Sequence, residues 1–304
     1  MDTAIALLLV TGSTVGVLRA RYQWRREIRI SSIFIYPIKG MRGCAVDEAE
    51  LDECGIVGDR RFLVIDGADG SFVTQRTVPA MATLTPQLLK KTSGGNKPQQ
   101  SQLLISSPYS AALCVDVITS SELDAGVAPR GSARRVVRIW SSQVANAVDQ
   151  GDEAGAWLSS TLGVANLRLV YMDQHCLRPI VDKLVDVTDR IVAFTDGFPL
   201  LLLGEASVAD LNLHATESIP HGRFRTNLLV SHAPAYAEDF WMRFTIGKHA
   251  IPFWGAKRCS RCRVTTTDQV RYMSREKISC SGHKLTLIMC NSHIPHAMHR
   301  VLPL

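Results

Sequence analysis

The order of apolar and polar residues predicts a chain built mainly of short strands. Ile28 to Ile38 is rich in Ile and Phe and contains Pro37 near its end, which is typical of a strand that runs into a loop. Arg61 to Ile65 and Ser71 to Gln75 are rich in β-forming residues and flank an Asp/Gly-rich turn, so we expect them to pair as a hairpin. Further strands are expected at 134–140, 167–171, 198–203, 224–231, 240–247 and 250–255.

Two segments have the spacing of a helix. DEAGAWLSSTLG (152–163) has acids in its first turn and ends in Gly163. One face of that helix carries Ala154, Trp157, Leu158 and Leu162. EASVADLN (205–212) follows a buried apolar run and predicts the second helix. Many strands, few helices and no internal repeat predict a β-rich α+β fold, and TSGGNKPQQSQ (92–102) reads as a polar loop.

The N-terminus begins with an uncharged apolar run, residues 4 to 18, followed by RARYQWRR. The run is shorter than the roughly 20 residues that span a bilayer, although Asp2 to Ala20 extends it. Because the arginines follow the apolar run, a retained membrane anchor is favoured over a cleaved secretory signal or a matrix presequence. The positive-inside rule then places the folded body in the cytosol.

Composition narrows the class further. A chain of 304 residues with 46% hydrophobic content is long enough for one large domain or two moderate ones. The net charge of +6 is concentrated in the two end segments and leaves the middle net acidic, so no nucleic-acid partner is expected. The eight cysteines do not have the spacing of a small disulfide-rich domain, which indicates a reducing compartment.

The segment KRCSRCRVTTTD (257–268) holds Cys259 and Cys262 among four cations, which stabilise a thiolate. Such a cysteine serves as a nucleophile, a redox partner or a metal ligand, and the spacing alone leaves these open. A structural zinc site would draw its other ligands from Cys280, Cys290, His283, His293, His296 and His299. A thioredoxin-like motif needs a strand-to-helix junction, whereas Val264 to Thr267 reads as a strand. Two ordinary cysteines remain the simplest alternative.

Eight segments resemble, in the same order, those of the MOSC family, and within it the amidoxime-reducing components. They are YPIKG (36–40), GDRRFLVID (58–66), VTQR (73–76), VDQGDEAGAWLSSTLG (148–163), FTDGFPLLLLGEAS (194–207), RFRTNLLVS (223–231), YAEDFW (236–241) and CSRCRVTTTD (259–268). The resemblance implies an N-terminal β-domain packed on a MOSC β-barrel. We therefore expect an anchor with its basic flank at 1–27, the N-terminal domain at 28–150 and the MOSC domain at 151–304.

The resemblance also implies a site. Cys262 would be the catalytic protein ligand of molybdenum, beside two dithiolene sulfurs of a pterin cofactor. The residues implied to hold that cofactor are Lys39, Gly40, Arg60, Asp196, Gly197, Arg225, Asn227, Ser260 and Arg261. Arginine presents a planar fork that suits the cofactor's phosphate. Gly40 and Gly197 replace hydroxyl residues of the animal proteins, and backbone N–H groups at glycine still allow close approach.

The implied reaction is the two-electron reduction of N-hydroxylated compounds such as amidoximes, with molybdenum cycling between +6 and +4. Electrons would come from NADH through cytochrome b5 reductase and cytochrome b5, at the mitochondrial outer membrane. In cofactor sulfurases that use pyridoxal phosphate, a related MOSC domain forms the C-terminal part of the enzyme. This chain has no pyridoxal-phosphate domain, so pyridoxal phosphate binding is an association of the family, and a sulfur-handling role ranks behind the reductase.

The resemblance weakens after Asp268 and stops at Ile278. Beyond it, KLTLIM (284–289) is the only strand-like piece in a polar, His-rich stretch. We therefore expect an atypical, truncated C-terminus, in which 269–304 are poorly ordered and the closing strands of the barrel are missing. Loss of those strands would weaken cofactor binding. A non-catalytic MOSC protein is the alternative function.

Overall fold

The computed structural model describes residues 27–90, 101–173, 175–176, 178–180, 190–215, 217–259, 263–266, 285–290 and 300–303. The apolar run at 4–18 and most of the expected loop at 92–102 lie outside these ranges. Within them, no helix has both the length and the apolar character needed to cross a membrane.

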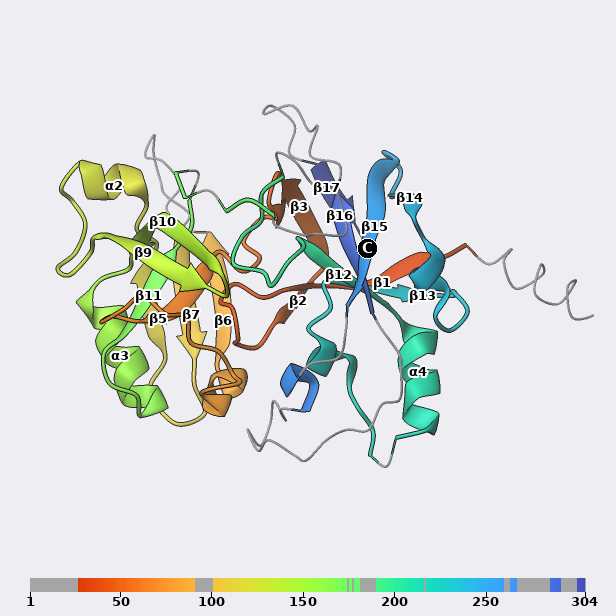
Figure 1. Ribbon diagram of the computed structural model, residues 1–304, viewed down its shortest axis with the longest axis horizontal. Helices are drawn as coiled ribbons and strands as arrows, with labels where there is room; N and C mark the ends of the chain where they lie inside the picture. The colour runs from red at the N-terminus through yellow and green to blue at the C-terminus, as the bar shows by residue number, and fades with distance from the viewer. Residues whose placement is uncertain are drawn as a thin grey trace, which may run out of the picture.

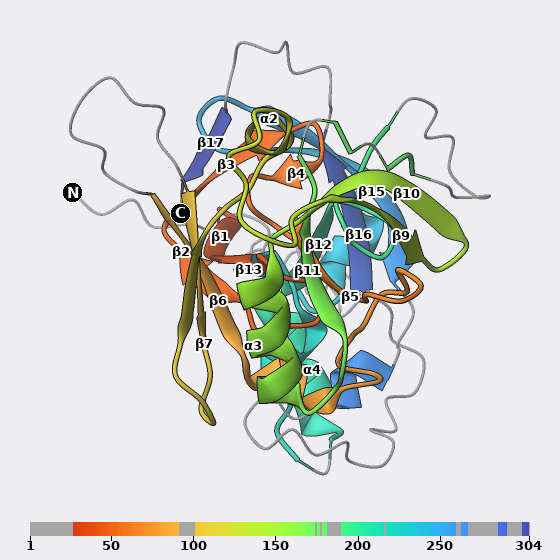
Figure 2. The same cartoon turned by 90° about the vertical axis from the view of Figure 1, so that its left-hand side faces the viewer.

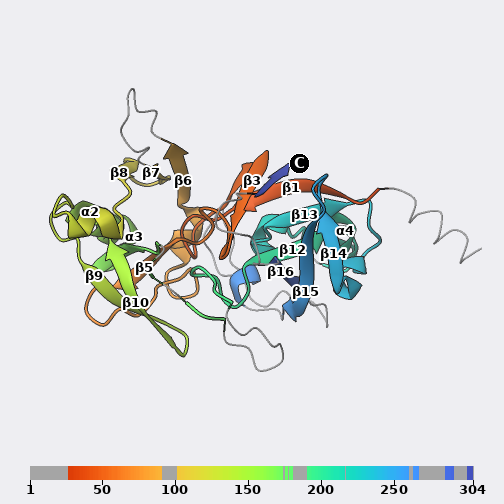
Figure 3. The same ribbon diagram turned by 90° about the horizontal axis from the view of Figure 1, so that it is seen from above.

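The elements form two lobes that lie side by side (Figures 1 and 3). The first lobe has a four-stranded sheet, in the order β5 (Phe62–Asp66), β11 (Leu167–Tyr171), β10 (Ser142–Asp149), β9 (Arg134–Ile139). A second sheet of the same lobe has the order β6 (Thr85–Lys90), β7 (Ser101–Ser106), β8 (Leu113–Asp116). Three short helices accompany them: η1 (Pro79–Thr83), α2 (Ser120–Asp124) and α3 (Asp152–Leu162).

The second lobe is built on a seven-stranded sheet. Its order is β14 (Arg243–Ile246), β15 (Ile251–Cys259), β16 (Leu285–Cys290), β12 (Leu200–Gly204), β13 (Leu228–Ser231), β1 (Arg29–Ile35), β2 (Cys44–Val46). A small sheet beside it has the order β17 (Arg300–Pro303), β3 (Glu48–Asp52), β4 (Gly55–Ile56). The remaining helices are α4 (Glu205–Leu213), η2 (His221–Phe224), η3 (Ala237–Phe240) and η4 (Arg263–Thr266). Helix α4 packs against β12 and β13.

Strand pairing brings distant parts of the chain together. In the second lobe β1 is antiparallel to β13, with Ile33 opposite Leu228. In the first lobe β5 is antiparallel to β11, with Val64 opposite Leu169. The boundary expected near residue 150 therefore falls between β10 and β11, which are neighbouring strands of one sheet.

The closed barrel expected for the second lobe is not found among the described strands. Strands β14 and β2 stand at opposite ends of the seven-strand order and do not pair with each other. A barrel has no free edge, so it requires hydrogen bonds between its first and last strands. Strand β2 instead packs near β6 of the first lobe, and this sheet stays open.

Local patterns predicted both helices and about half of the described strands, while β2, β3, β4, β6, β7, β8 and β10 were not expected. The hairpin is confirmed, since the amide of Val73 donates to Val64 O (2.8 Å) and that of Asp66 donates to Ser71 O (2.9 Å). Helix α3 ends as expected, because Gly163 adopts a left-handed φ of 66°. It lies along β11 (Figure 2), with Ala154 and Leu158 in the core of the first lobe.

Two expectations were wrong. The stretch Val264 to Thr267 reads as a strand from its β-branched residues, but Arg263–Thr266 forms the short helix η4, which packs on η2. The expectation that the whole stretch 269–304 is poorly ordered fails for β16 and β17. Strand β16 pairs with both β12 and β15, with Ile288 opposite Leu200 and Gly255. An unpaired edge of apolar β12 would leave backbone groups without partners, and β16 satisfies them.

Candidate functional site

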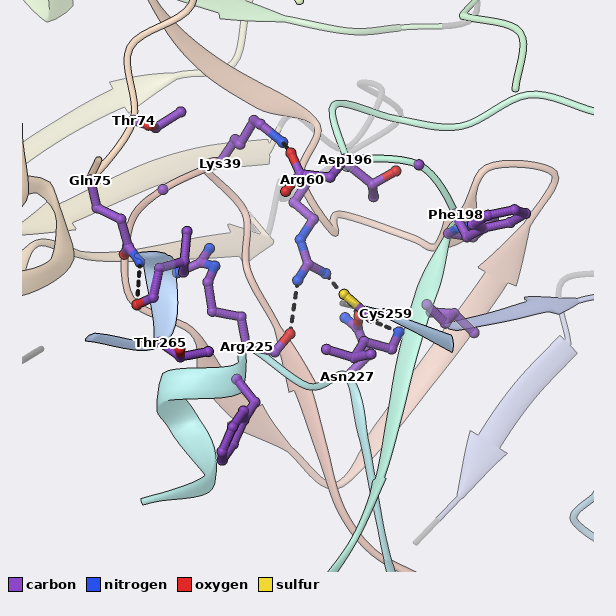
Figure 4. A pocket seen from close by; sticks show the side chains of 18 of the residues that line it. Lys39, Arg60, Thr74, Gln75, Asp196, Phe198, Arg225, Asn227, Cys259 and Thr265 are labelled. Carbon is purple, nitrogen blue, oxygen red and sulfur yellow. Dashed lines mark hydrogen bonds and ion pairs between the residues drawn. The ribbon is translucent and has the colours of Figure 1, made fainter. Parts of the chain in front are cut away.

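A cavity of about 150 Å³ lies where segments of both lobes meet. Figure 4 shows its side chains converging from separate parts of the chain. The lining residues come from the loop after β1, the turn between β4 and β5, the loop after β5, the segment entering β12, the η2–β13 junction, the end of β15 and η4. They include Lys39, Gly40, Arg60, Thr74, Gln75, Arg76, Thr195, Asp196, Gly197, Phe224, Arg225, Asn227, Cys259, Val264 and Thr265.

Two guanidinium groups of the cavity flank one buried ring. Tyr36 is 2% exposed, and its ring centroid lies 4.6 Å from Arg60 Cζ and 4.4 Å from Arg225 Cζ. Its hydroxyl donates to Thr226 O at 3.1 Å. Burial raises the pKa of Tyr36 to about 12, against the lowering effect of both guanidiniums. The neutral ring thus offers each of the two like charges a cation–π contact.

Backbone and side-chain hydrogen bonds fix these guanidiniums. Arg60 Nη1 donates to Asn227 Oδ1 at 2.8 Å, and Arg60 Nη2 donates to Arg225 O at 2.9 Å. Arg225 Nη1 donates to Met41 O. Both arginines have a left-handed backbone, with φ of 48° and 59°, a conformation that persists only where surrounding contacts enforce it. Burial and the neighbouring Arg60 lower the pKa of Arg225 to about 10.

The third cation of the cavity is Lys39, whose ammonium donates to Asp196 Oδ1. Burial lowers the pKa of Lys39 to about 8, although Asp196 counteracts this. Burial by itself would raise the pKa of Asp196, but Lys39 and Arg76 outweigh it and hold that pKa well below its usual range. Four cationic side chains line the cavity against a single lining carboxylate, that of Asp196: Lys39, Arg60, Arg76 and Arg225. Arg60 is also paired with the buried carboxylate of Asp59.

Three buried polar atoms on the cavity wall have no hydrogen-bond partner within the described structure. They are Arg225 Nη2, Thr195 Oγ1 and Gln75 Oε1. Leaving such an atom unpaired costs about 1 to 3 kcal/mol, so a bound ligand that pairs with it is favoured. Beside them, Gly197 has no heavy atom within 4 Å of the place where a Cβ would stand. The cavity thus fits a polar ligand that carries negative charge and also N–H or O–H donors.

Seven of the residues implied to hold a cofactor line this one cavity: Lys39, Gly40, Arg60, Asp196, Gly197, Arg225 and Asn227. Ser260, Arg261 and Cys262 lie outside the described residues, but Cys259 before them and Val264 after them both line the cavity. Among the described residues, no three His, Cys, Asp or Glu side chains are grouped to hold a metal ion. Other proposed zinc ligands, Cys280 and the four histidines, are also outside those ranges.

Sequence reasoning missed Tyr36, Gln75 and Thr195 as parts of the site. All three stand in the quoted motifs YPIKG, VTQR and FTDGFP, or directly beside a chosen residue. For Gln75 and Thr195 the signal was a polar side chain next to a charged one, Arg76 or Asp196, whereas Tyr36 has no charged neighbour in the sequence. That signal cannot separate a buried residue from an exposed one, so burial had to be seen in three dimensions.

Comparison with known proteins places the chain in a family. The family model described as "MOSC N-terminal beta barrel domain" matches residues 27–165, and that described as "MOSC domain" matches residues 189–284. Mitochondrial amidoxime-reducing component 1 of Mus musculus is 30% identical over 276 residues, covering 87% of this chain and 74% of that protein. The chain belongs to the MOSC family.

Two further relatives of this MOSC protein have similar names. Mitochondrial amidoxime-reducing component 1 of Homo sapiens is 29% identical, and the match covers 90% of this chain and 79% of that protein. Mitochondrial amidoxime reducing component 2 of Rattus norvegicus is 28% identical, and the match covers 87% of this chain and 75% of that protein. The MOSC domain match ends at residue 284, directly before β16.

Proposed function

We propose that this MOSC protein is a molybdenum-cofactor-dependent reductase of N-hydroxylated compounds such as amidoximes. The observation that carries the proposal is the meeting of Lys39, Arg60, Arg225 and Asn227 in one cavity, in a chain 30% identical to a protein named for amidoxime reduction. The cavity's excess of cations and its unpaired polar atoms suit a phosphate-bearing pterin.

The residues have distinct proposed roles. Arg60 and Arg225 bind the anionic part of the cofactor, and the Tyr36 ring contacts both guanidiniums. Lys39 Nζ holds a proton at neutral pH and is oriented by Asp196. Backbone groups of Gly40 and Gly197, together with Ser260 and Arg261, complete the binding set, and Cys262 is the proposed thiolate ligand of the metal. When bound, the cofactor supplies two electrons for cleavage of the N–O bond, which with two protons yields an amidine and water.

The proposed location, electron donors and domain division rest on the sequence and on its resemblance to the family. The names of the relatives include the word mitochondrial. We propose that residues 1–27 anchor this chain in the mitochondrial outer membrane with the folded body in the cytosol. Cytochrome b5 and its NADH-dependent reductase are the proposed electron donors. The proposed division is an N-terminal domain at 28–150 and a MOSC domain from 151.

The test is production of the full chain in a host that makes the cofactor, followed by metal analysis and assay of benzamidoxime reduction with NADH, cytochrome b5 and its reductase. Roughly one molybdenum per chain and turnover of benzamidoxime are expected. Cys262→Ala should remove both, whereas Cys259→Ala should be much milder, because the pterin supplies the other two sulfurs. Zinc in place of molybdenum, or equal loss in both variants, would refute the assignment.

The same measurement decides the alternative of a non-catalytic MOSC protein. That alternative was based on missing closing strands, and the pairing of β16 with β12 and β15 removes part of its basis. A purified chain without molybdenum would favour it over the reductase.

A further inference from the structure

The loop after β5 holds Gln75 in one orientation at the cavity wall. The amide of Val78 donates to Thr74 O at 2.8 Å, and the amide of Arg76 donates to Thr74 Oγ1 at 3.2 Å. Thr77 Oγ1 donates to the same Thr74 carbonyl at 3.0 Å. Opposite, a Cβ added to Gly40 would stand 3.3 Å from Gln75 N, so glycine lets the two loops approach closely. This closed turn fixes the direction of the Gln75 side chain.

The hydrogen bond of the Gln75 carboxamide identifies which end of the side chain is the nitrogen and which is the oxygen. Gln75 is 2% exposed, and one end of its amide lies 3.3 Å from Val264 O in η4 (Figure 4). A backbone carbonyl only accepts hydrogen bonds, so the NH2 end must face Val264. The other end is therefore the acceptor Oε1, which is buried and has no partner within the described structure.

Gln75 Oε1 differs from the charged groups around it, which are either donors or an acceptor that is already paired. Lys39, Arg60 and Arg225 offer only donors to a ligand. Asp196, the lining carboxylate, is already engaged by Lys39 and by Trp140 Nε1 at 3.3 Å. Gln75 Oε1 is thus a buried lining acceptor whose hydrogen-bonding capacity no described group uses. Among the described residues, this acceptor is therefore left for a ligand that brings an N–H or O–H donor to this point.

We propose that Gln75 is a recognition and positioning residue of the cavity: Nε2 holds the Val264 carbonyl, and Oε1 accepts a hydrogen bond from a donor of the bound ligand. The inference rests on the proposed function, because it assigns ligand chemistry within the same site. The donor is an N–H of the pterin ring or the N–H or O–H of an amidoxime substrate. Through Val264, Gln75 also positions η4, the helix that follows Cys262.

Two substitutions separate the acceptor from the donor. Gln75→Glu keeps an acceptor of the same size, loses the NH2 group that holds the Val264 carbonyl and adds a negative charge when ionised. Gln75→Met keeps the length and loses both the acceptor and the donor, so the two variants share the loss of the Val264 bond and differ in the acceptor. Gln150→Met is the matched control, because Gln150 is equally buried but its amide is fully paired with Ile118 and Val148, away from the cavity. Each variant of the full chain is measured for molybdenum per chain, for kcat and KM with benzamidoxime, and for thermal midpoint.

The two ligand sources give different results. If Oε1 binds the cofactor, Gln75→Met lowers molybdenum content about tenfold, while Gln75→Glu changes it by less than about threefold. If Oε1 binds substrate, molybdenum is unchanged and KM rises about tenfold in the Met variant only. Equal effects of Glu and Met, or effects no larger than those of Gln150→Met, would overturn the inference.

Failure of the proposed function is distinguishable from failure of this inference. A wild-type chain that retains molybdenum but does not reduce benzamidoxime would refute the proposed reaction, and the molybdenum contents of the two Gln75 variants would still decide the role of Oε1. A wild-type chain produced in a cofactor-making host without any molybdenum would overturn both.

Discussion

Replacement of Tyr36 tests whether one aromatic ring holds the two guanidiniums of the cavity. In Tyr36→Phe the ring stays and only the hydroxyl bond to Thr226 O is lost, which should cost about 0.5 to 1.5 kcal/mol of the free energy of unfolding. In Tyr36→Leu both cation–π contacts, at 4.6 and 4.4 Å, are lost as well. At about 1 to 2 kcal/mol for each desolvated contact, the Leu variant should be less stable than the Phe variant by about 2 to 4 kcal/mol in addition to the packing cost of replacing a ring by leucine.

The assay is urea unfolding of the full chain, with Phe62→Leu as a matched control. Phe62 is also fully buried, but its ring neighbour is Tyr171 at 4.8 Å, and no cation lies over it among the described contacts. The control therefore measures the packing cost of replacing a ring by leucine. A difference between Tyr36→Leu and Tyr36→Phe no larger than the Phe62→Leu cost would refute the cation–π argument. Molybdenum content should fall in the Leu variant and stay near wild type in the Phe variant.

Three further predictions concern charge and the N-terminus. Lys39 has a pKa lowered from 10.5 to about 8, so charged Lys39 destabilises the folded chain, and the free energy of unfolding should rise as the pH increases from about 8 to 10.5. Retention of an anionic ligand should fall above about pH 8. Lys39→Arg, which stays charged, should remove the fall; an unchanged pH profile would contradict this. Asp149 is fully buried and accepts hydrogen bonds from Arg135 and Arg168. Asp149→Asn should cost about 3 to 5 kcal/mol in urea unfolding, and a cost under about 1 would show the pairing to be unimportant. Deleting residues 1–25 should release a soluble body in sedimentation assays, whereas aggregation would indicate that the apolar run packs within the fold.

Sequence periodicity determined the elements whose stability is local. Helix α3 was predictable because its first-turn acids, its apolar face and Gly163 all act within a few residues of each other. The hairpin between β5 and Ser71 to Gln75 was predictable because a short turn fixes its register. Motifs in order along the chain also predicted the family and seven of the residues that line the cavity, since each motif is a contiguous run.

Tertiary structure decided what depends on distant partners. Strand β16 comes from a stretch without family resemblance, yet β12 and β15 offer it unpaired edges, which no local pattern in KLTLIM reports. The segment after Cys262 forms η4 instead of a strand because it packs on η2 and is held by Gln75. Lys39 and Arg225 owe their lowered pKa values, and Gln75 its unpaired oxygen, to burial among segments far apart in sequence. Burial and hydrogen-bond partnership are properties of the folded arrangement, so only the three-dimensional structure could show them.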